Sequence, residues 1–460
     1  MAEKLIEEIE RRLNAKTIHD IRQIARAVGV PRPADGRKER ILDCIMKIAS
    51  GESDPAVPSV RGAHPKSTEY DRQIVSDILR CREICLSANG GDEREKTYIG
   101  VSSGAGFDPL DFTAEGLLCR SDGKWFLRVF GKGGSCGDVF VNDFFVNNFS
   151  LREGDSVYGN CKRSNEDELA GLAGIISVNG VSPEDTGRRT HFNNLIPIYP
   201  DKILRLAHGG DIVGRMIDMF APLGAGQRAF ITAPHGAGKT ALLKRIAAAL
   251  KNCVKDIATV IALVDARPEE AADFQRTFSG GVFASTFDEG AQNAVDTALL
   301  ALEHCKRLVE QKKDAVLILD DITRLARAYN SCGRQVASAL DTSALDGVKR
   351  YLAAARNTEG GGSLTVISAL TDGGDGIDGA VRSGLINLCG MRISLSAELA
   401  KARVYPPLDL QNTYSSVSDT LLSSAEHKTA EALRGMRTEE VINLFSQTRD
   451  NAALCEELSR

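Results

Sequence analysis

A glycine-rich stretch at residues 233–250, APHGAGKTALLKRIAAAL, has the residue types of a phosphate-binding loop. It follows the apolar run 228–232 and opens a helical pattern, which is the strand-to-helix context that such a loop requires. Gly236 and Gly238 allow the backbone N–H groups to face phosphate oxygens, and the helix start adds partial positive charge. Lys239 offers a charge to the β- and γ-phosphates, and Thr240 offers a hydroxyl to Mg²⁺. The stretch predicts a site for ATP and Mg²⁺ formed by Pro234, His235, Gly236, Ala237, Gly238, Lys239, Thr240 and Ala241.

A second acidic element stands at residues 314–330, DAVLILDDITRLARAYN. Its apolar run ends in Asp320 and Asp321, as a buried strand would end beside the phosphate loop. We predict that Asp320 holds the Mg²⁺ through water. The alternative is that both acids belong to an ordinary turn after a strand.

Between these two motifs lies LVDARPEEAADFQR, residues 263–276, where an apolar run ends in an acid. In a nucleotide hydrolase this is a natural place for the carboxylate that activates water. The residue there is Ala266, whose methyl group can neither accept a proton nor orient water.

The composition is that of a globular protein with no general affinity for polyanions. The chain has 460 residues, 43% hydrophobic and 26% charged residues, and a formal net charge of -5. A nucleic-acid site must therefore be local. The 11 cysteines lack a CxxC pair and the chain has 7 histidines, which favours reduced thiols over a zinc site. No apolar run is long enough for a membrane span, so we expect a cytoplasmic protein with no membrane partner.

The chain divides into several segments by pattern. Residues 1–50 predict a small helical module, 51–68 a flexible linker rich in Pro, Ser and Gly, and 69–111 a helix with a Gly-rich connector. Residues 112–182 hold short alternating runs separated by turns, which are typical of a five-stranded OB-type barrel. After a linker at 183–200, apolar strands alternate with helices over 201–460, which predicts a multi-domain α/β protein with a largely parallel sheet.

Together these motifs resemble the Rho family of bacterial transcription termination factors, which are RNA-dependent ATPases and translocases. The segments that carry the resemblance are APHGAGKT, VDARPEEAADFQR, ASTFDEGAQN, KRLVEQKKDAVLILDDITRLARAYN and AARNTEGGGSLTVISAL, with ISVNGVSPE and FNNLIPIYP before them. The resemblance implies a Rho N-terminal-like helical module, a cold-shock-like RNA-binding barrel and a RecA-like motor domain. It also implies a homo-hexameric ring with ATP at subunit interfaces and single-stranded RNA as the polymer handled.

The same resemblance identifies departures at catalytic positions. The family pattern is D-E-R-P-E-E, and Ala266 replaces the glutamate that polarises the attacking water. Ser416 stands where an arginine reaches the γ-phosphate of the neighbouring subunit, and Ala397 replaces an earlier arginine. The arginines that match retained nucleotide-site positions are Arg267, Arg324 and Arg403. We therefore expect ATP binding with weak or absent hydrolysis, because a lost general base costs about 10²–10⁴ in rate.

The RNA contacts that the resemblance implies are only partly present. In the barrel, the family's stacking phenylalanine and following arginine match Phe126 and Arg128, beside Trp125 and Lys132, whereas Leu169 replaces another aromatic. The alternative is that Trp125 and Phe126 divide between barrel core and surface and bind nothing. Two channel loops are also altered: Arg334 fits the lysine of one, but Gly376 beside Asp375 replaces the gripping lysine of the other.

Three functions remain open from the sequence. The chain could be an active RNA translocase, a Rho-derived ring protein that binds ATP without turning it over, or a non-enzymatic RNA-binding scaffold. We favour the second, acting as a static ring or together with RNA polymerase or a second, active Rho.

Overall fold

The computed structural model describes residues 9–28, 30, 37–50, 74–75, 78, 111–129, 138–162, 169–208, 210–278, 280–333, 341–373 and 376–459. The chain forms two compact units, Met1–Arg188 and Arg189–Arg460. The boundary falls inside the predicted linker 183–200. The predicted linker 51–68 and most of the predicted connector 69–111 lie outside the described residues.

The first unit begins with short helices, as the isoleucine spacing predicts. Residues 9–14 are helical, followed by α2 (Ile18–Val28) and α3 (Lys38–Ala49). Ile21, Ile24, Ile41 and Ile45 are at most 2% exposed and form one apolar cluster, because residues three and four apart share a helix face.

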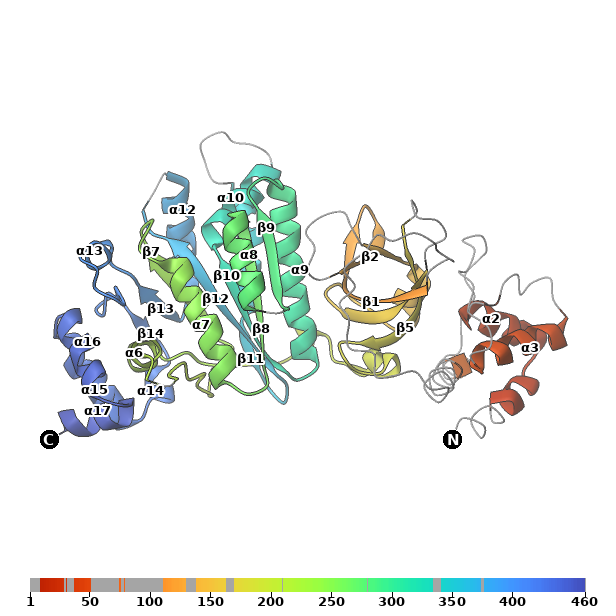
Figure 1. The fold of residues 1–460 in the computed structure, drawn as a ribbon, viewed down its shortest axis with the longest axis horizontal. Coiled ribbons are helices and arrows are strands. Elements are labelled where there is room, and N and C mark those ends of the chain that lie inside the picture. The colour runs from red at the N-terminus through yellow and green to blue at the C-terminus, as the bar shows by residue number, and fades with distance from the viewer. Residues whose placement is uncertain are drawn as a thin grey trace. The chain divides into compact units, whose positions relative to one another are not determined.

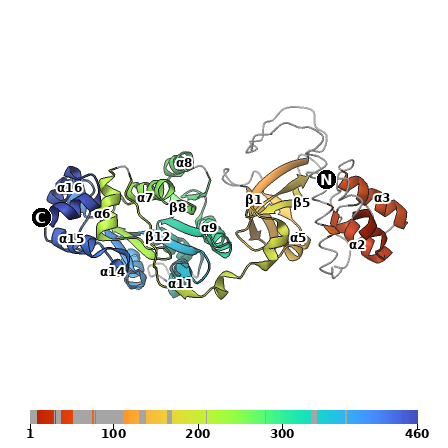
Figure 2. The ribbon, with the colours of Figure 1, turned by 90° about the horizontal axis from the view of Figure 1, so that it is seen from below.

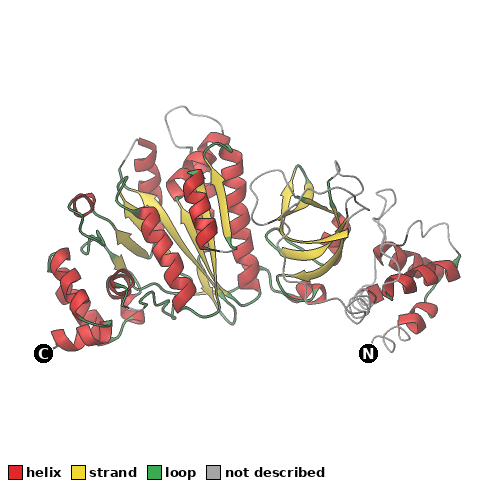
Figure 3. Cartoon of the chain, in the orientation of Figure 1, coloured by secondary structure: helices red, strands yellow, loops and turns green. Residues whose placement is uncertain are grey.

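The second part of this unit is a closed five-stranded barrel, which confirms the OB-type prediction (Figure 3). The elements are β1 (Asp111–Ser121), β2 (Lys124–Val129), β3 (Val139–Val141), α5 (Asp143–Asn148), β4 (Ser156–Lys162), β5 (Gly171–Val178) and the 3-10 turn η1 (Pro183–Arg188). The strand order is β1-β2-β3-β5-β4. Gly159 is required where β4 meets β5, since a Cβ there would lie 2.3 Å from the carbonyl oxygen of Gly174.

The second unit is built on one large sheet in which most neighbouring strands are parallel (Figure 1). Its main order is β14-β13-β7-β12-β10-β8-β9. These strands are β7 (Arg228–Ala233), β8 (Ile257–Ala266), β9 (Val282–Thr286), β10 (Asp314–Asp320), β12 (Ser363–Thr371), β13 (Met391–Ser394) and the antiparallel β14 (Tyr414–Ser415). The short strands β6 (Pro197–Ile198) and β11 (Arg356–Thr358) extend β12 off this path.

Helices cover both faces of this sheet, with α7 and α8 on one side and α9 and α11 on the other (Figure 2). All nine residues of β12 are buried, which is expected of a parallel strand covered on both faces. The helices are α6 (Ile212–Phe220), α7 (Lys239–Cys253), α8 (Pro268–Thr277), α9 (Ala291–Glu310), α10 (Ile322–Cys332), α11 (Thr342–Ala354) and α12 (Gly376–Leu385).

Small helices complete the C-terminal part of this unit. They are α13 (Ala397–Lys401), α14 (Ser418–Leu421), α15 (Ser424–Arg434), α16 (Thr438–Gln447) and α17 (Asn451–Leu458), preceded by the 3-10 turn η3 (Ile386–Leu388). Another 3-10 turn, η2 (Phe192–Asn194), lies at the start of the unit. The Arg215 guanidinium on α6 donates to the carbonyl oxygens of Phe445 (2.7 Å) and Thr448 (2.6 Å), which fixes the end of α16. Within the described part of the chain, no helix is long and apolar enough to cross a membrane.

Candidate functional site

The candidate nucleotide site lies where four neighbouring strands end. Thr371 at the end of β12 is paired with Ala233 at the end of β7, and Asp320 at the end of β10 is paired with Leu263 in β8. Because these strands are parallel, their carboxyl ends share one edge of the sheet. The phosphate loop after β7, the acidic pair after β10 and the end of β8 therefore lie side by side.

The loop between β7 and α7 has the backbone form that its glycines predict. Gly236 and Gly238 have φ values of 78° and 94°, in the left-handed region that favours glycine. Gly238 is also the N-terminal cap residue of α7, so the first amides of that helix face the loop. This arrangement directs backbone donors and the positive end of a helix toward a phosphate.

The side chain of Lys239 is engaged by the ends of the two neighbouring strands. Its Nζ donates to the Thr371 hydroxyl at 2.5 Å and lies 3.5 Å from Asp321 Oδ2. The Thr371 hydroxyl in turn donates to Asp321 Oδ2 at 2.8 Å. The sequence reasoning missed both partners of this lysine, although Asp321 could have been found as the second acid of the DD pair.

Asp320 lies beside Thr240, as a metal site requires. Burial raises the pKa of Asp320 to about 6, and the negative charge of Asp321 adds to this rise. A hydrogen bond with the Thr240 side chain lowers the pKa, as do the positive charges of Arg324 and Lys239. A hydroxyl and a carboxylate are hard oxygen donors that suit Mg²⁺ with water in its remaining positions. These two residues would hold the ion.

A cavity of about 320 Å³ adjoins the phosphate loop. Its lining includes Gly236, Gly238 and Leu242 from the loop and α7, and Arg403 and Tyr405 from the segment after α13. Tyr405 is 53% exposed, and the Arg245 guanidinium lies over its ring at 5.4 Å. The sequence reasoning identified Arg403 but missed Tyr405, whose ring gives this cavity an apolar wall of the kind that a nucleobase needs.

The two other predicted arginines, Arg324 and Arg267, lie on segments other than the phosphate loop. Arg324 Nη1 donates to the backbone oxygen of Asp265 at 2.8 Å, linking the start of α10 to the end of β8. Arg267 is exposed and precedes α8. Both stand at the same edge of the sheet as the loop.

The position expected to carry the catalytic carboxylate is apolar and buried. Ala266 is 4% exposed, ends β8 and belongs to the apolar core on the α7 and α8 side of the sheet. The acids that follow it are engaged elsewhere or exposed: Glu270 accepts from the Arg267 backbone N–H at 3.5 Å, and Glu269 is exposed on α8. The end of β8 thus places no carboxylate at position 266.

Ser416 lies at the opposite edge of the sheet from the phosphate loop. Its backbone N–H donates to the Gly390 oxygen at 2.7 Å, next to the pair formed by Ser415 and the first residue of β13, Met391. No arginine or lysine stands between Arg403 and Lys428. The segment therefore offers no arginine or lysine, whichever of its residues is matched to the family's arginine. Ala397, the other replaced arginine, begins α13.

In the barrel, strand β2 separates the two predicted stacking residues. Trp125 packs against the barrel core, with the Arg120 guanidinium 5.5 Å from its ring. Phe126 projects to the other face, where its ring meets the Phe140 ring edge-on at 6.0 Å. Arg128 is on the same face of β2 as Phe126 and lies 3.9 Å from Asp138. The structure thus brings Phe126 and Arg128 together, adds Phe140, and leaves Trp125 with the core.

Other predicted RNA positions are placed only in part. Lys132, Arg334 and Asp375 lie outside the described residues. Gly376 is the first residue of α12, and Leu169, which replaces a family aromatic, is 59% exposed before β5.

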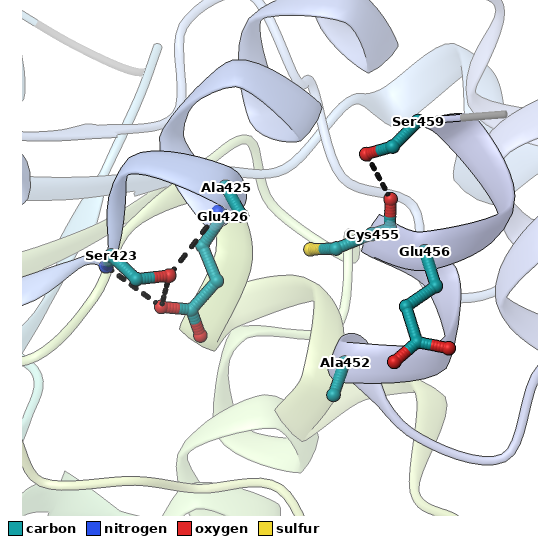
Figure 4. A pocket seen from close by; sticks show the side chains of 7 residues that line it. All are labelled: Ser423, Ala425, Glu426, Ala452, Cys455, Glu456 and Ser459. Carbon is teal, nitrogen blue, oxygen red and sulfur yellow. Dashed lines mark hydrogen bonds between the residues drawn. The ribbon is translucent and has the colours of Figure 1, made fainter.

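A larger cavity, of about 640 Å³, lies among the C-terminal helices and contains none of the predicted site residues (Figure 4). Its acid Glu426 accepts from the Ser423 backbone N–H at 2.9 Å and hydroxyl at 2.8 Å, and pairs with Arg205 at 2.8 Å. The bonds with Ser423 form a capping box at the start of α15, and the ion pair ties that helix to Arg205, which gives Glu426 a structural role.

An OB-type barrel and a RecA-like phosphate-loop unit on one chain define a nucleic-acid-binding ATPase class, and comparison with known proteins agrees. Residues 114–184 match the family model of the Rho termination factor, RNA-binding domain, and residues 214–415 match the ATP synthase alpha/beta family, nucleotide-binding domain. An ATPase of a type III secretion system of pathogenic bacteria shares the fold, with a TM-score of 0.50 and 20% identity over 65% of this chain and 93% of that one.

The relatives specify the family further. The chain is 39% identical to the transcription termination factor Rho of Bacillus subtilis, over 68% of its own length and 75% of that protein. It is 34% identical to the Rho of Pseudomonas aeruginosa, over 85% of its length and 99% of that protein, and 36% identical to the Rho of Micrococcus luteus, of which it spans 53%. The chain belongs to the Rho family.

Proposed function

We propose that this chain is a Rho-type ring subunit in transcription termination or its regulation that binds ATP with Mg²⁺ but hydrolyses it weakly or not at all. The observation that carries the proposal is the buried Ala266 at the end of β8, beside a phosphate loop with its lysine and metal-binding groups in place. The site has the means to hold a triphosphate and lacks the usual means to cleave it.

Three features support binding. Gly236 and Gly238 adopt the conformations that a phosphate cradle needs, and Thr240 and Asp320 form an oxygen pair suited to Mg²⁺. The cavity lined by Arg403 and Tyr405 offers room for a base next to the loop. Nucleotide binding is also what membership of an ATPase family supports.

Two losses argue against turnover, and they are independent of each other. A positioned general base contributes about 10²–10⁴ in rate, and an arginine supplied in trans about 10³–10⁵. The first is missing at Ala266, and the second is missing from the segment between Arg403 and Lys428. Together they leave electrostatic stabilisation by Lys239 and the metal as the remaining contribution to catalysis.

For RNA, the barrel supports a weakened version of the family's activity. Phe126 and Arg128 provide one stacking ring and one cation on a shared face. We propose that the chain assembles as a homo-hexamer or mixes with an active Rho, works on single-stranded RNA with RNA polymerase, and is cytoplasmic.

The test measures binding and hydrolysis on the same preparation of the 460-residue chain. We expect a non-hydrolysable ATP analogue with Mg²⁺ to bind, and phosphate release to stay near background with or without cytosine-rich RNA. Lys239→Ala is the control that defines background binding. Turnover at the rate of a working helicase would overturn the proposal.

A second candidate, an active ATP-dependent RNA translocase, is favoured by one specific observation. Asp321 is a carboxylate only 3.5 Å from the Nζ of Lys239, and it could stand near a γ-phosphate. If Asp321 oriented the attacking water, phosphate release would be substantial and would be lost in Asp321→Asn.

A further inference from the structure

Asp321 makes contacts that fix it firmly beside the phosphate loop. Its Oδ1 accepts from the Arg324 backbone N–H at 2.7 Å, which caps the N-terminus of α10. Its Oδ2 accepts from the Thr371 hydroxyl at 2.8 Å, and the residue is 3% exposed. A buried carboxylate at a helix N-terminus is held in place by hydrogen bonds and by the positive end of the helix.

These contacts reach the phosphate-binding lysine. Lys239 Nζ donates to Thr371 Oγ1 and lies near Asp321 Oδ2, so at least one of its three N–H donors is occupied within the protein. Only 12% of the Lys239 side chain and 4% of the Asp321 side chain are exposed, so water screens their attraction weakly. A triphosphate must therefore share this ammonium group with Thr371 and Asp321.

The charge of Asp321 acts against the ligand in a second way. Asp320 and Asp321 are consecutive at the end of β10, and Asp320 is the residue suited to the metal. Asp321 therefore adds a second negative charge next to the lysine and the metal position that a triphosphate would use. Like charges in a buried site repel one another more strongly than in water.

We propose that Asp321 is a positioning residue that holds Lys239 through Thr371 and competes with the triphosphate for it, which lowers the affinity of the site for ATP. This inference deepens the proposed function and rests on it, since both concern the same ATP site. It assigns to Asp321 a role in setting nucleotide affinity and none in activating water, because both of its oxygens already accept hydrogen bonds and hardly any of its surface meets solvent.

The experiment compares the wild type with Asp321→Asn and Asp321→Ser, both of which can still cap α10 through a side-chain oxygen. We expect each variant to bind a non-hydrolysable ATP analogue with Mg²⁺ about three- to tenfold more tightly, because removing one partner of a buried pair frees the other. The matched control is Asp450→Asn, which removes a capping carboxylate from α17, far along the chain from the phosphate loop. We expect its affinity to equal that of the wild type.

Three readouts separate the outcomes. Thermal melting monitors the stability of α10. If Asp321 had only a structural role, the two variants would melt at a lower temperature with unchanged affinity for the ATP analogue, and this result would overturn the inference. Weaker binding in both variants would overturn it as well, as would phosphate release that disappears in Asp321→Asn at unchanged affinity. Rapid ATP hydrolysis by the wild type would overturn the proposed function but not this inference. The difference in affinity between the wild type and the variants would still decide the role of Asp321.

Discussion

The edge of the large sheet where β7, β12 and β10 end differs sharply from the end of β8 next to it. On the first three strands, the loop glycines, Lys239, Thr240 and Asp320 have the conformations and neighbours that triphosphate binding needs. On the fourth, the catalytic position is the buried methyl group of Ala266. Under the proposed function, one site combines a region that binds the triphosphate with a neighbouring region that lacks the carboxylate for cleaving it.

The two regions also differ in how much they destabilise the folded protein. An Asp320 whose pKa is raised to about 6 and a lysine enclosed beside a second acid are unfavourable in a protein that has no ligand for them. An alanine at the end of a strand has no such cost. The presence of the costly groups supports the proposal that the chain binds a nucleotide at the phosphate loop, whereas a buried methyl group at position 266 supports packing alone.

The largest expected effect comes from restoring the second region. Ala266→Glu combined with Ser416→Arg should raise ATP hydrolysis by roughly 10²–10⁴, because the glutamate would orient water and the arginine would reach a neighbouring subunit's γ-phosphate. Phosphate release by assembled rings measures the gain. The matched control is Ala266→Gln with Ser416→Arg, which has the same size and no base.

This result depends on the fold tolerating a larger residue at a position that is 4% exposed. Both double variants should therefore melt at the same temperature and bind the ATP analogue equally. An assembled ring of the glutamate variant with no gain over the glutamine variant would mean that the β8 end does not limit hydrolysis.

The grip is tested next, by Lys239→Ala. Loss of a charged hydrogen-bond donor to phosphate should weaken ATP-analogue binding by about 10- to 150-fold, which corresponds to roughly 1.5–3 kcal/mol. Isothermal titration measures the affinity. Lys244→Ala is the control, since that lysine lies on the same helix but pairs with Asp273 at 2.6 Å. Equal affinities in the two variants would contradict the assignment of Lys239 to the phosphates.

The sequence alone pointed to the phosphate-loop residues but not to the residues that contact them. A short motif fixed by backbone geometry, such as the stretch from Gly236 to Thr240, is readable because each residue type has one local purpose. The contacts of Lys239 with Thr371 and Asp321 join segments more than eighty residues apart, so only the strand order brings them together. Because side chains alternate along a strand, the sequence alone implied that Trp125 and Phe126 lie on opposite faces of β2. Which of these faces points away from the core depended on how the barrel closes.

The barrel provides a third test, which asks whether the chain binds RNA even though its ATP hydrolysis is expected to be weak or absent. Phe126→Ala should weaken binding of single-stranded RNA by about 1–3 kcal/mol, the usual contribution of one stacked base. Fluorescence anisotropy with a cytosine-rich oligonucleotide measures it. Tyr199→Ala, which removes an 86% exposed ring in the second unit, is the control and should bind as the wild type does. An unchanged affinity in Phe126→Ala would place the RNA contact elsewhere.

The smallest expected effect concerns Mg²⁺, and it tests whether the ion contributes to nucleotide binding. Chelation of Mg²⁺ should weaken ATP-analogue binding by about tenfold, because Thr240 and Asp320 would hold the ion and its charge would offset that of the phosphates. Thr240→Ala should show this weaker binding already in Mg²⁺ and should change little on chelation. Thr277→Ala, whose hydroxyl bonds only along α8 to the Asp273 oxygen at 2.8 Å, should keep the full response to Mg²⁺. If Thr240→Ala also kept that response, the ion would bind without the hydroxyl, and the region around the phosphate loop would hold the nucleotide by Lys239 and backbone amides alone.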